Sequence, residues 1–411
     1  MIKSFLILIL SVFFISEAFP QSRTLDYYLS EALNKSPLLK DYENQLRTGS
    51  IDSLMTLCAF KPRVDITSQV LIAPVGHNVG YDEAITNGGN YAAVIGVKQP
   101  LFNDKIKTAR LENINLVKQT IGVNKRLTQA DLTKSITLQY ISAYADYELL
   151  QYCSSTIKML YEQQAAVKFM VESGIYLQTD LMNLGIAKES QEIFYKQQYI
   201  QYKNDVALLN LLSGIVDTAV VQLEKPELKL KDNFDIRQSP VVLQFTLDSL
   251  KNCNAKSMVD LDYRPKFEAF ADAGFMAIKP LNIPFNFGTS FGLNLVVPVY
   301  DGKLRIQEYQ KIEIAENSRK NYRDFYVTQY RQQYLQLSEQ LHLTDELIRD
   351  ISHQISQQNE LISLYRAELE KGLARFTDFL SAINSVTNTR NALIAAEMNR
   401  MQLINQLNFL K

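Results

Sequence analysis

The sequence ESGIYLQTD at residues 172–180 has a related copy, EKGLARFTD, at residues 370–378, and this repeat is the strongest indication of the fold. A second motif behaves in the same way: PLFNDK at residues 100–105 returns as PVYDGK at residues 298–303. The two copies of each motif lie 198 residues apart. The chain of 411 residues is therefore a tandem duplication of one long unit, and we expect each main structural element to occur twice.

Long helices are predicted after each PLFNDK-type motif. All eleven prolines lie outside residues 101–225 and 299–411, and proline costs roughly 3 kcal/mol inside a helix. Apolar residues recur there at spacings of three, four and seven, which is typical of a coiled-coil seam. The seam of the second copy consists of Leu337, Leu341, Ile348, Ile351, Ile355, Ile362, Tyr365 and Leu369. Its last six positions correspond to Leu150, Cys153, Ile157, Gln164, Val167 and Val171, so we expect Cys153 to be a buried apolar side chain.

Each seam ends at a glycine, Gly174 or Gly372, and a new apolar-periodic segment begins after Thr179-Asp180 or Thr377-Asp378. Glycine after a helix end and Thr or Asp before a helix start are the expected caps of a tight helical hairpin. We therefore predict long antiparallel helices at residues 103–173 and 179–213, and again at 301–371 and 377–408. The longer helix of each pair would span about 100 Å.

Strands are predicted ahead of each helical pair. Apolar and polar residues alternate over residues 64–72 and 286–297, and less cleanly over 90–102 and 265–278. A period of two indicates strands with different environments on their two faces. Four strands form two hairpins, with loops at residues 75–89 and 279–285. Shorter helices are expected at residues 24–56, with a break at Pro37, and at 241–260.

Composition and the N-terminus exclude several classes of protein. The 43 basic and 44 acidic residues are mixed, which disfavours a nucleic-acid binder. Residues 1–21 read as a secretory signal peptide, with Lys3 before an apolar run. No later run of 18 apolar residues follows, so a membrane crossing would require strands. The three cysteines fit neither a disulfide framework nor a zinc site, and we expect no metal and no cofactor.

Four membrane-type strands cannot close a barrel alone, because closure takes at least about eight strands. Several copies of the chain would have to associate. Three copies would supply twelve strands, and their helices would continue as a hollow coiled-coil tube. A tube attached to a barrel is a conduit.

The chain resembles the TolC-like outer-membrane efflux proteins. The resemblance covers essentially the whole mature chain and rests on TL at residues 24–25, EALNKSP at 31–37, the strand-to-helix junctions at Pro100 and Pro298, the two hairpin tips and LINQLN at 403–408. It implies a mainly α fold with β, in which a homotrimer forms a periplasmic α-barrel and a twelve-stranded transmembrane β-barrel. Most of the mass would lie in the periplasm, below the outer membrane.

The resemblance also implies function and partners. The chain would be the passive exit duct of a tripartite efflux or secretion system, docking a periplasmic adaptor and an inner-membrane pump. It contains no phosphate-binding glycine loop, so energy would come from the pump. By resemblance the adaptor-docking tips contain Gly174, Ile175, Asp180, Gly372, Leu373 and Asp378.

Two of these roles have simpler alternatives. Gly174 and Gly372 would also be explained as helix caps. Asp378 is proposed to form a lumen-facing ring of three carboxylates, or else to cap a helix; Ser381 stands where well-known family members carry a second acid. Candidates for an interfacial aromatic girdle, or for ordinary packing, are Tyr91, Phe102, Phe267, Phe275, Phe291 and Tyr300.

The predicted domain organisation follows the duplication. After the signal peptide, residues 22–213 form the first repeat, with an N-terminal helix, a β-hairpin at 62–102 and a helical hairpin at 103–213. Residues 214–240 form a connector. Residues 241–411 form the second repeat, with a helix at 241–260, a β-hairpin at 265–300 and a helical hairpin at 301–408.

Three other classes of protein fit the sequence less well. An enzyme is disfavoured because the only histidines, His77, His342 and His353, have no catalytic constellation around them. A periplasmic coiled-coil scaffold or adaptor would share the heptads but would not need four alternating strands. A passive porin would devote most of its length to strands.

Overall fold

The computed structural model describes residues 22–74, 89–219, 221–231, 236, 239–369 and 371–410. The chain divides into two compact units. The hairpin unit lies within residues 1–40, 126–236 and 326–411, and the sheet unit comprises residues 41–125 and 237–325. Each unit therefore combines segments from both copies of the duplication. The predicted signal peptide, His77 and residues 75–88 of the first predicted loop lie outside the described residues.

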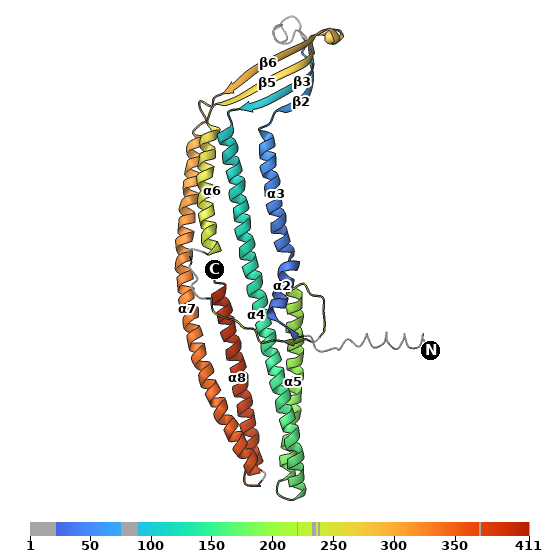
Figure 1. Ribbon diagram of the computed structural model, residues 1–411, viewed down its shortest axis with the longest axis vertical. Helices are drawn as coiled ribbons and strands as arrows, with labels where there is room; N and C mark the ends of the chain where they lie inside the picture. The colour runs from blue at the N-terminus through green and yellow to red at the C-terminus, as the bar shows by residue number, and fades with distance from the viewer. Residues whose placement is uncertain are drawn as a thin grey trace, which may run out of the picture. The chain divides into compact units, whose positions relative to one another are not determined.

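The sheet unit contains four antiparallel strands in the order β2-β3-β5-β6 (Figure 1). Their bounds are β2 (Arg63–Ile72), β3 (Gly89–Leu101), β5 (Lys266–Ala277) and β6 (Phe287–Val296), which confirms all four predicted strands. The helices α3 (Pro37–Ala59) and α6 (Pro240–Asp262) precede β2 and β5. The predicted loop at residues 279–285 is wrong in one respect: Pro280–Phe285 form a 3₁₀ helix, η2, because Pro280 supplies a helix-compatible φ at its first position.

The register of the sheet gives it two different faces. One row across the four strands is apolar and joins Val64, Val97, Ala271 and Phe291. The adjacent row points to the opposite face and joins Asp65, Gly96, Asp272 and Ser290. Within the described residues, the outer strands β2 and β6 each pair along one edge only, so both outer edges of the sheet are open.

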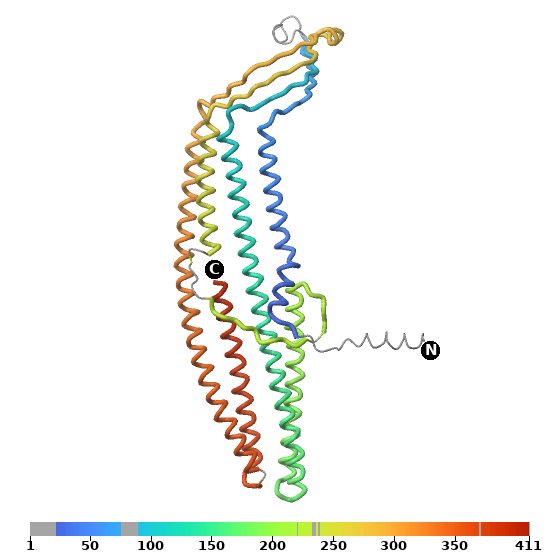
Figure 2. Tube along the Cα trace, viewed as in Figure 1, coloured from blue at the N-terminus to red at the C-terminus, as the bar shows by residue number. Residues whose placement is uncertain are grey.

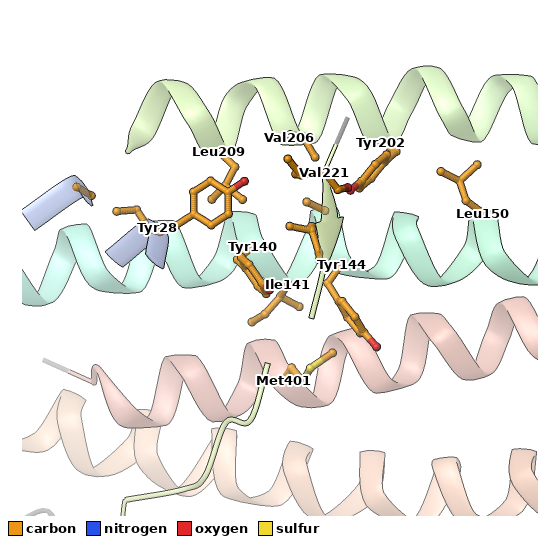
Figure 3. Close-up of a cluster of buried hydrophobic side chains, with 14 residues drawn as sticks. Tyr28, Tyr140, Ile141, Tyr144, Leu150, Tyr202, Val206, Leu209, Val221 and Met401 are labelled. Carbon is orange, nitrogen blue, oxygen red and sulfur yellow. The ribbon is translucent and has the colours of Figure 1, made fainter. Parts of the chain in front are cut away.

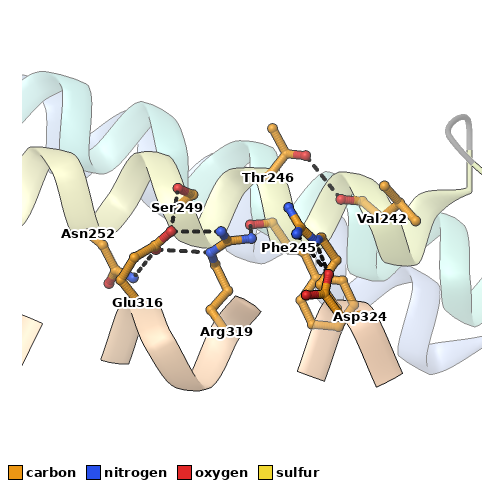
Figure 4. A network of polar contacts seen from close by, with 9 residues as sticks. Val242, Phe245, Thr246, Ser249, Asn252, Glu316, Arg319 and Asp324 are labelled. Atoms are coloured by element: carbon orange, nitrogen blue, oxygen red, sulfur yellow. Dashed lines mark hydrogen bonds and ion pairs between the residues drawn. The ribbon is translucent and has the colours of Figure 1, made fainter. Parts of the chain in front are cut away.

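A polar network joins α6 to α7 (Leu304–Leu369) inside the sheet unit (Figure 4). Glu316 and Arg319 form an ion pair with an N–O distance of 2.7 Å. Asn252 donates to Glu316 at 3.0 Å, and Arg319 donates to the Phe245 carbonyl at 3.3 Å. The Arg319 guanidinium, followed by the Asn252 amide, lowers the pKa of Glu316 to about 2. This network fixes α6 against α7 near the start of the second long helix.

The hairpin unit contains the helical pairs. Its elements are α2 (Leu25–Lys35), the distal part of α4 (Asp104–Glu172), α5 (Gln178–Leu212), the distal part of α7 and α8 (Phe376–Asn408). The predicted long helices are confirmed to within three residues at each end that the structure describes. The duplication is visible in the returning helices, because α5 and α8 begin 198 residues apart. Cys153 is completely buried, as predicted.

Helix α8 contacts two neighbours in the hairpin unit (Figures 1 and 2). Asn405 of α8 donates to the Lys134 carbonyl of α4 at 2.9 Å. Arg400 of α8 pairs with Asp345 of α7 at 2.6 Å. The α4–α5 hairpin and the α7–α8 hairpin are therefore joined through α8. Across the described residues, no helix combines the length and the apolar character needed to cross a bilayer.

A tyrosine-rich core lies in the hairpin unit (Figure 3). The short strands β1 (Ser22–Arg23) and β4 (Gln222–Leu223) pair in parallel. The Tyr140 hydroxyl lies 2.9 Å from the Arg23 carbonyl and 2.7 Å from the Glu224 carbonyl, and Tyr202 donates to Val221. The predicted connector thus contains a strand that the sequence did not reveal, because two residues carry no detectable period.

Two carboxyl groups meet between α4 and α5. Gln139 and Gln201 donate from their amides to the two carboxyl oxygens of Asp205, at 3.2 Å and 3.4 Å. The Oδ2 atom of Asp146 is shielded from solvent and has no hydrogen-bond partner among the described residues. Burial, together with the neighbouring Asp205, raises the pKa of Asp146 to about 7. At mildly acidic pH, Asp146 is therefore protonated.

The substitution Asp146→Asn is expected to stabilise the protein at pH 8 but not at pH 4. Because the folded state raises this pKa, the stability it contributes is complete below about pH 4 and is lost as pH rises through about 7. A neutral Asn avoids that loss, and we expect the thermal midpoint at pH 8 to rise by at least about 2 °C. Circular dichroism melts at both pH values measure this. Glu162→Gln on the same helix is the exposed control; an equal gain from Asp146→Asn at both pH values would contradict the prediction.

Candidate docking tips

The helices α4 and α7 end in turns of the same type. Gly174 and Gly372 have φ values of 74° and 70°, a region that glycine adopts without steric cost. Gly174 donates to the Val171 carbonyl at 3.0 Å, and Ile175 donates to the Met170 carbonyl at 2.9 Å. The second copy repeats both bonds, from Gly372 to Leu369 and from Leu373 to Glu368. These are Schellman caps, so the two glycines have a complete structural explanation.

The returning helices begin earlier than predicted. Their N-cap residues are Leu177 and Arg375, so Asp180 and Asp378 occupy the third helical position rather than the N-cap. The N-cap role, one of the two alternatives for Asp378, is therefore wrong. The Asp180 carboxylate instead accepts from the Leu177 backbone N–H at 3.1 Å, as the acid of a capping box does. Asp378 is exposed, and its carboxylate has no hydrogen bond or ion pair with any residue in the described part of the chain.

Apolar side chains are exposed at both turns. Ile175 is 55% exposed and Leu373 is 76% exposed, and both directly follow the capping glycines. The two tips also touch: a Cβ atom added at Gly372 would lie 3.1 Å from the Cγ2 atom of Ile175. Any larger residue at position 372 would press on the first tip as well as straining its own backbone.

Tyr176 joins the two tips. Its hydroxyl lies 3.2 Å from the Leu369 carbonyl and 3.1 Å from the Ala374 carbonyl, both in the second copy. Its ring stands edge-on to Phe376, with 6.5 Å between the centroids. Burial, followed by the charge of Asp180, raises the pKa of Tyr176, so the hydroxyl remains a donor. The sequence did not reveal this contact, because the position equivalent to Tyr176 is Ala374 and the duplication carries no second tyrosine.

One apolar cluster lies behind the tips and is shared by all four helices of the two hairpins. Its buried members are Leu160, Val167, Leu184, Leu369, Phe376, Phe379 and Ile383. Burial of such side chains contributes about 1.5–3 kcal/mol each. The structure thus brings Gly174, Ile175 and Asp180 together with Gly372 and Leu373 on one supported surface, while Asp378 lies exposed on the second tip.

The junction prolines sit at slightly different places. Pro100 lies within β3, opposite Glu268 of β5, one residue before the strand ends. Pro298 lies in the segment between β6 and α7. Both precede an exposed aromatic residue by two positions, Phe102 or Tyr300. The junctions therefore repeat in sequence and in exposure, but not in strand pairing.

Comparisons with known proteins identify the fold. No family model matches this sequence, and no curated protein matches it. Among solved structures, CusC matches with a TM-score of 0.74 and 14% identity, covering 95% of this chain and 93% of that chain. VceC from Vibrio cholerae, an outer membrane protein, matches with a TM-score of 0.74 and 13% identity over 94% and 95% of the two chains. The outer-membrane channel OprN matches with a TM-score of 0.73 and 12% identity over 94% and 89%.

The chain thus has the fold of known outer-membrane channels. This confirms the TolC-like fold expected from the duplicated motifs. The likeness covers 94–95% of this chain.

Proposed function

We propose that this protein is the outer-membrane exit duct of a tripartite efflux or secretion system, a passive conduit that docks a periplasmic adaptor and an inner-membrane pump. The observation that carries the proposal is the open four-stranded sheet, apolar on one face and unpaired along both outer edges within the described residues. A sheet of this kind is incomplete in one chain. The TM-scores of at least 0.70 against outer-membrane channels support the same assignment.

The sheet is proposed to lie in the outer membrane. Its apolar row faces solvent in the single chain, and Phe291 is 88% exposed. A bilayer would cover this face, whereas each unpaired backbone group at an open edge would cost several kcal/mol there. Pairing β2 of one copy with β6 of the next removes both edges. Three copies would then form a closed barrel of twelve strands, with most of the protein mass in the periplasm.

The helices supply matching surfaces for a homotrimer. On α5, four exposed apolar residues recur at helical spacing, and we call them the α5 stripe: Met182, Ile186, Ile193 and Ile200. On α7, the exposed apolar residues include Leu335, Leu343, Leu347, Leu361 and Leu364. Packing the α5 stripe of one copy on α7 of the next would bury both sets. The hairpins of three copies would then close into a helical barrel.

The tips are proposed as the adaptor-docking end. Ile175 and Leu373 present apolar side chains to solvent at the turns, and the cluster behind them keeps those turns in place. An adaptor with a helical hairpin would bury such residues. The scaffold and enzyme alternatives have less support. A periplasmic scaffold has no use for an exposed apolar sheet, and His342 and His353, on the surface of α7, form no catalytic group there.

The proposed function is tested by membrane fractionation and planar-bilayer recording. We expect the mature protein to occur in the outer-membrane fraction as a trimer whose electrophoretic migration changes on heating, and to produce discrete conductance steps after purification in detergent. A monomer that is purified without detergent and produces no conductance would favour the scaffold.

Asp378→Asn is expected to weaken cation block of the channel. In a trimer, three exposed carboxylates near the tip would attract cations, and removing them lowers the affinity of a trivalent blocking cation by roughly fivefold, the factor for about 1 kcal/mol. Single-channel recording measures the blocking concentration and the cation selectivity. Asp180→Asn is the matched control, because its carboxylate is engaged by the Leu177 N–H. Unchanged block and selectivity in Asp378→Asn would remove the carboxylate ring from the proposal.

A further inference from the structure

We propose that the four junctions where the chain passes between a helix and a strand of the sheet unit form a binding surface for anionic phospholipid headgroups of the periplasmic leaflet. We call these junctions the crossings. This inference rests on the proposed function, which places the sheet in the outer membrane. It adds a partner of defined chemistry, because the surface combines unpaired cations with exposed aromatic rings.

Basic side chains mark all four crossings. The two crossings from helix to strand carry the same basic-proline-basic pattern, at Lys61-Pro62-Arg63 and at Arg264-Pro265-Lys266. The two crossings from strand to helix carry a pair of basic residues two positions apart. These pairs are Lys105 with Lys107 and Lys303 with Arg305.

At each crossing one cation is neutralised and one is not. Arg63, Lys107, Lys266 and Arg305 pair with Asp65, Asp104, Asp262 and Asp260, at N–O distances of 2.8, 2.6, 3.4 and 2.6 Å. The remaining four side chains are exposed and have no carboxylate within ion-pair distance in the described ranges of the chain. We call them the free cations: Lys61, Lys105, Arg264 and Lys303. The exposed Lys98, opposite Arg63, also has no ion pair within the described residues. Unpaired positive charge at every crossing suits a ligand that carries negative charge.

The four crossings lie at one end of the sheet. Arg63 is opposite Lys98, Leu101 is opposite Phe267, and Lys266 is opposite Val296. Strands that alternate in direction therefore begin or end at the same level. Figure 1 shows α3, α4, α6 and α7 meeting the strands at this end. A trimer would arrange twelve such crossings around its circumference.

Exposed aromatic rings accompany the free cations. Phe102 is 85% exposed and Tyr300 is 84% exposed, and they occupy equivalent positions of the two copies. The Phe102 backbone has a positive φ of 56°, which is unfavourable for a bulky residue. Its ring contacts Phe267, which belongs to the apolar face of the sheet, with 5.7 Å between the centroids. Aromatic rings beside basic side chains are typical of the membrane–water interface.

This combination favours lipid over a soluble acidic partner. The cations are distributed singly over four crossings rather than gathered into one patch, and the same level borders the face proposed to contact acyl chains. Lipid phosphates occur at this depth all around a membrane protein. A basic side chain near an anionic surface contributes about a fivefold gain in binding.

The inference is tested with the detergent-purified trimer. Native mass spectrometry measures how many phosphatidylglycerol and phosphatidylcholine molecules remain bound from an equimolar mixture. The test variant combines Lys61→Gln, Lys105→Gln, Arg264→Gln and Lys303→Gln. The matched control combines four exposed helical lysines, as Lys158→Gln, Lys168→Gln, Lys311→Gln and Lys320→Gln. A charge-conserving variant exchanges Lys for Arg and Arg for Lys at the four free cations.

We expect the wild type, the control and the charge-conserving variant to prefer phosphatidylglycerol, and the test variant to lose at least about fivefold of that preference. If the test variant does not form a trimer, the double variants Lys61→Gln with Arg264→Gln and Lys105→Gln with Lys303→Gln are each expected to lose about half of the preference on a logarithmic scale. A conducting wild-type trimer without lipid preference, or a test or double variant that keeps the full preference, overturns this inference alone. Absence of a conducting trimer overturns the proposed function and this inference together.

Discussion

Deletion of residues 174–180 is expected to abolish export while leaving a trimer in the outer membrane. The deletion removes the Schellman turn, the exposed Ile175 and the Tyr176 contact with the second tip. It leaves the sheet and the α4 seam residues Leu150 to Val171 intact. We expect export to fall by at least about a hundredfold, the factor for about 2.7 kcal/mol of lost docking free energy. Accumulation of the exported compound in cells measures the loss, and heat-modifiable migration measures the trimer.

Substitutions separate loss of docking from loss of the turn. Ile175→Asp keeps the turn but places a charge on its exposed apolar position, and Leu373→Asp does the same on the second tip. Tyr176→Phe keeps the ring but removes the hydroxyl that reaches Leu369 and Ala374. Normal export by the deletion would contradict the docking assignment. Loss of the trimer in the deletion would show that the tip is needed for assembly.

The sequence could predict the large elements because two independent patterns agree. Proline is absent from the two long helical stretches, and the last six seam positions, at residues 348–369, recur 198 residues earlier. The structure buries Leu337, Ile355 and Leu369 of this second-copy seam, and the other five seam residues are partly buried. Strand alternation was equally decisive, because a shift by one residue would have moved Val64 and Ile66 to the polar face. The duplication gave each of the two motifs a second copy that supports the same prediction.

Features without a repeated counterpart could not be predicted. Tyr176 acts across the two copies, and no local pattern reveals which backbone carbonyls its hydroxyl will reach. The sequence predicts the starts of α5 and α8 one residue late, because Thr and Asp are common N-caps, whereas Asp180 reaches back to the N–H of Leu177 from inside the helix. The pairing of β1 with β4 joins segments of two residues that lie some two hundred positions apart.

The differences between the two tips have a physical consequence. The first tip contributes Tyr176, whose hydroxyl reaches the second tip, and the capping acid Asp180. The second tip contributes the exposed Asp378 and the more exposed apolar residue, Leu373. The two turns are therefore similar in sequence but not equivalent, because the first contacts the second through the Tyr176 hydroxyl. We expect Leu373→Asp and Ile175→Asp to reduce export by different amounts.

The double substitution Ile193→Asp and Ile200→Asp is expected to prevent assembly of the trimer. Both residues belong to the α5 stripe, and each is more than half exposed in the single chain. Contact with α7 of the next copy would bury them, and a buried carboxylate without a partner costs several kcal/mol. A closed trimer would contain six such charges. We expect the heat-modifiable trimer in the outer membrane to fall by at least about tenfold, the factor for only about 1.4 kcal/mol.

A control with the same charge makes this result specific to the stripe. Gln151→Asp with Ser154→Asp adds two carboxylates to exposed, polar positions of α4, outside the proposed contact between the α5 stripe and α7. These side chains are already hydrated, so we expect the control to assemble at the wild-type level. Circular dichroism of both variants compares their helical content, which the substitutions should preserve because the stripe lies outside the buried seam. A normal trimer in the Ile193→Asp and Ile200→Asp variant would mean that α5 does not face a second copy, and the proposed helical barrel would have to close through another surface.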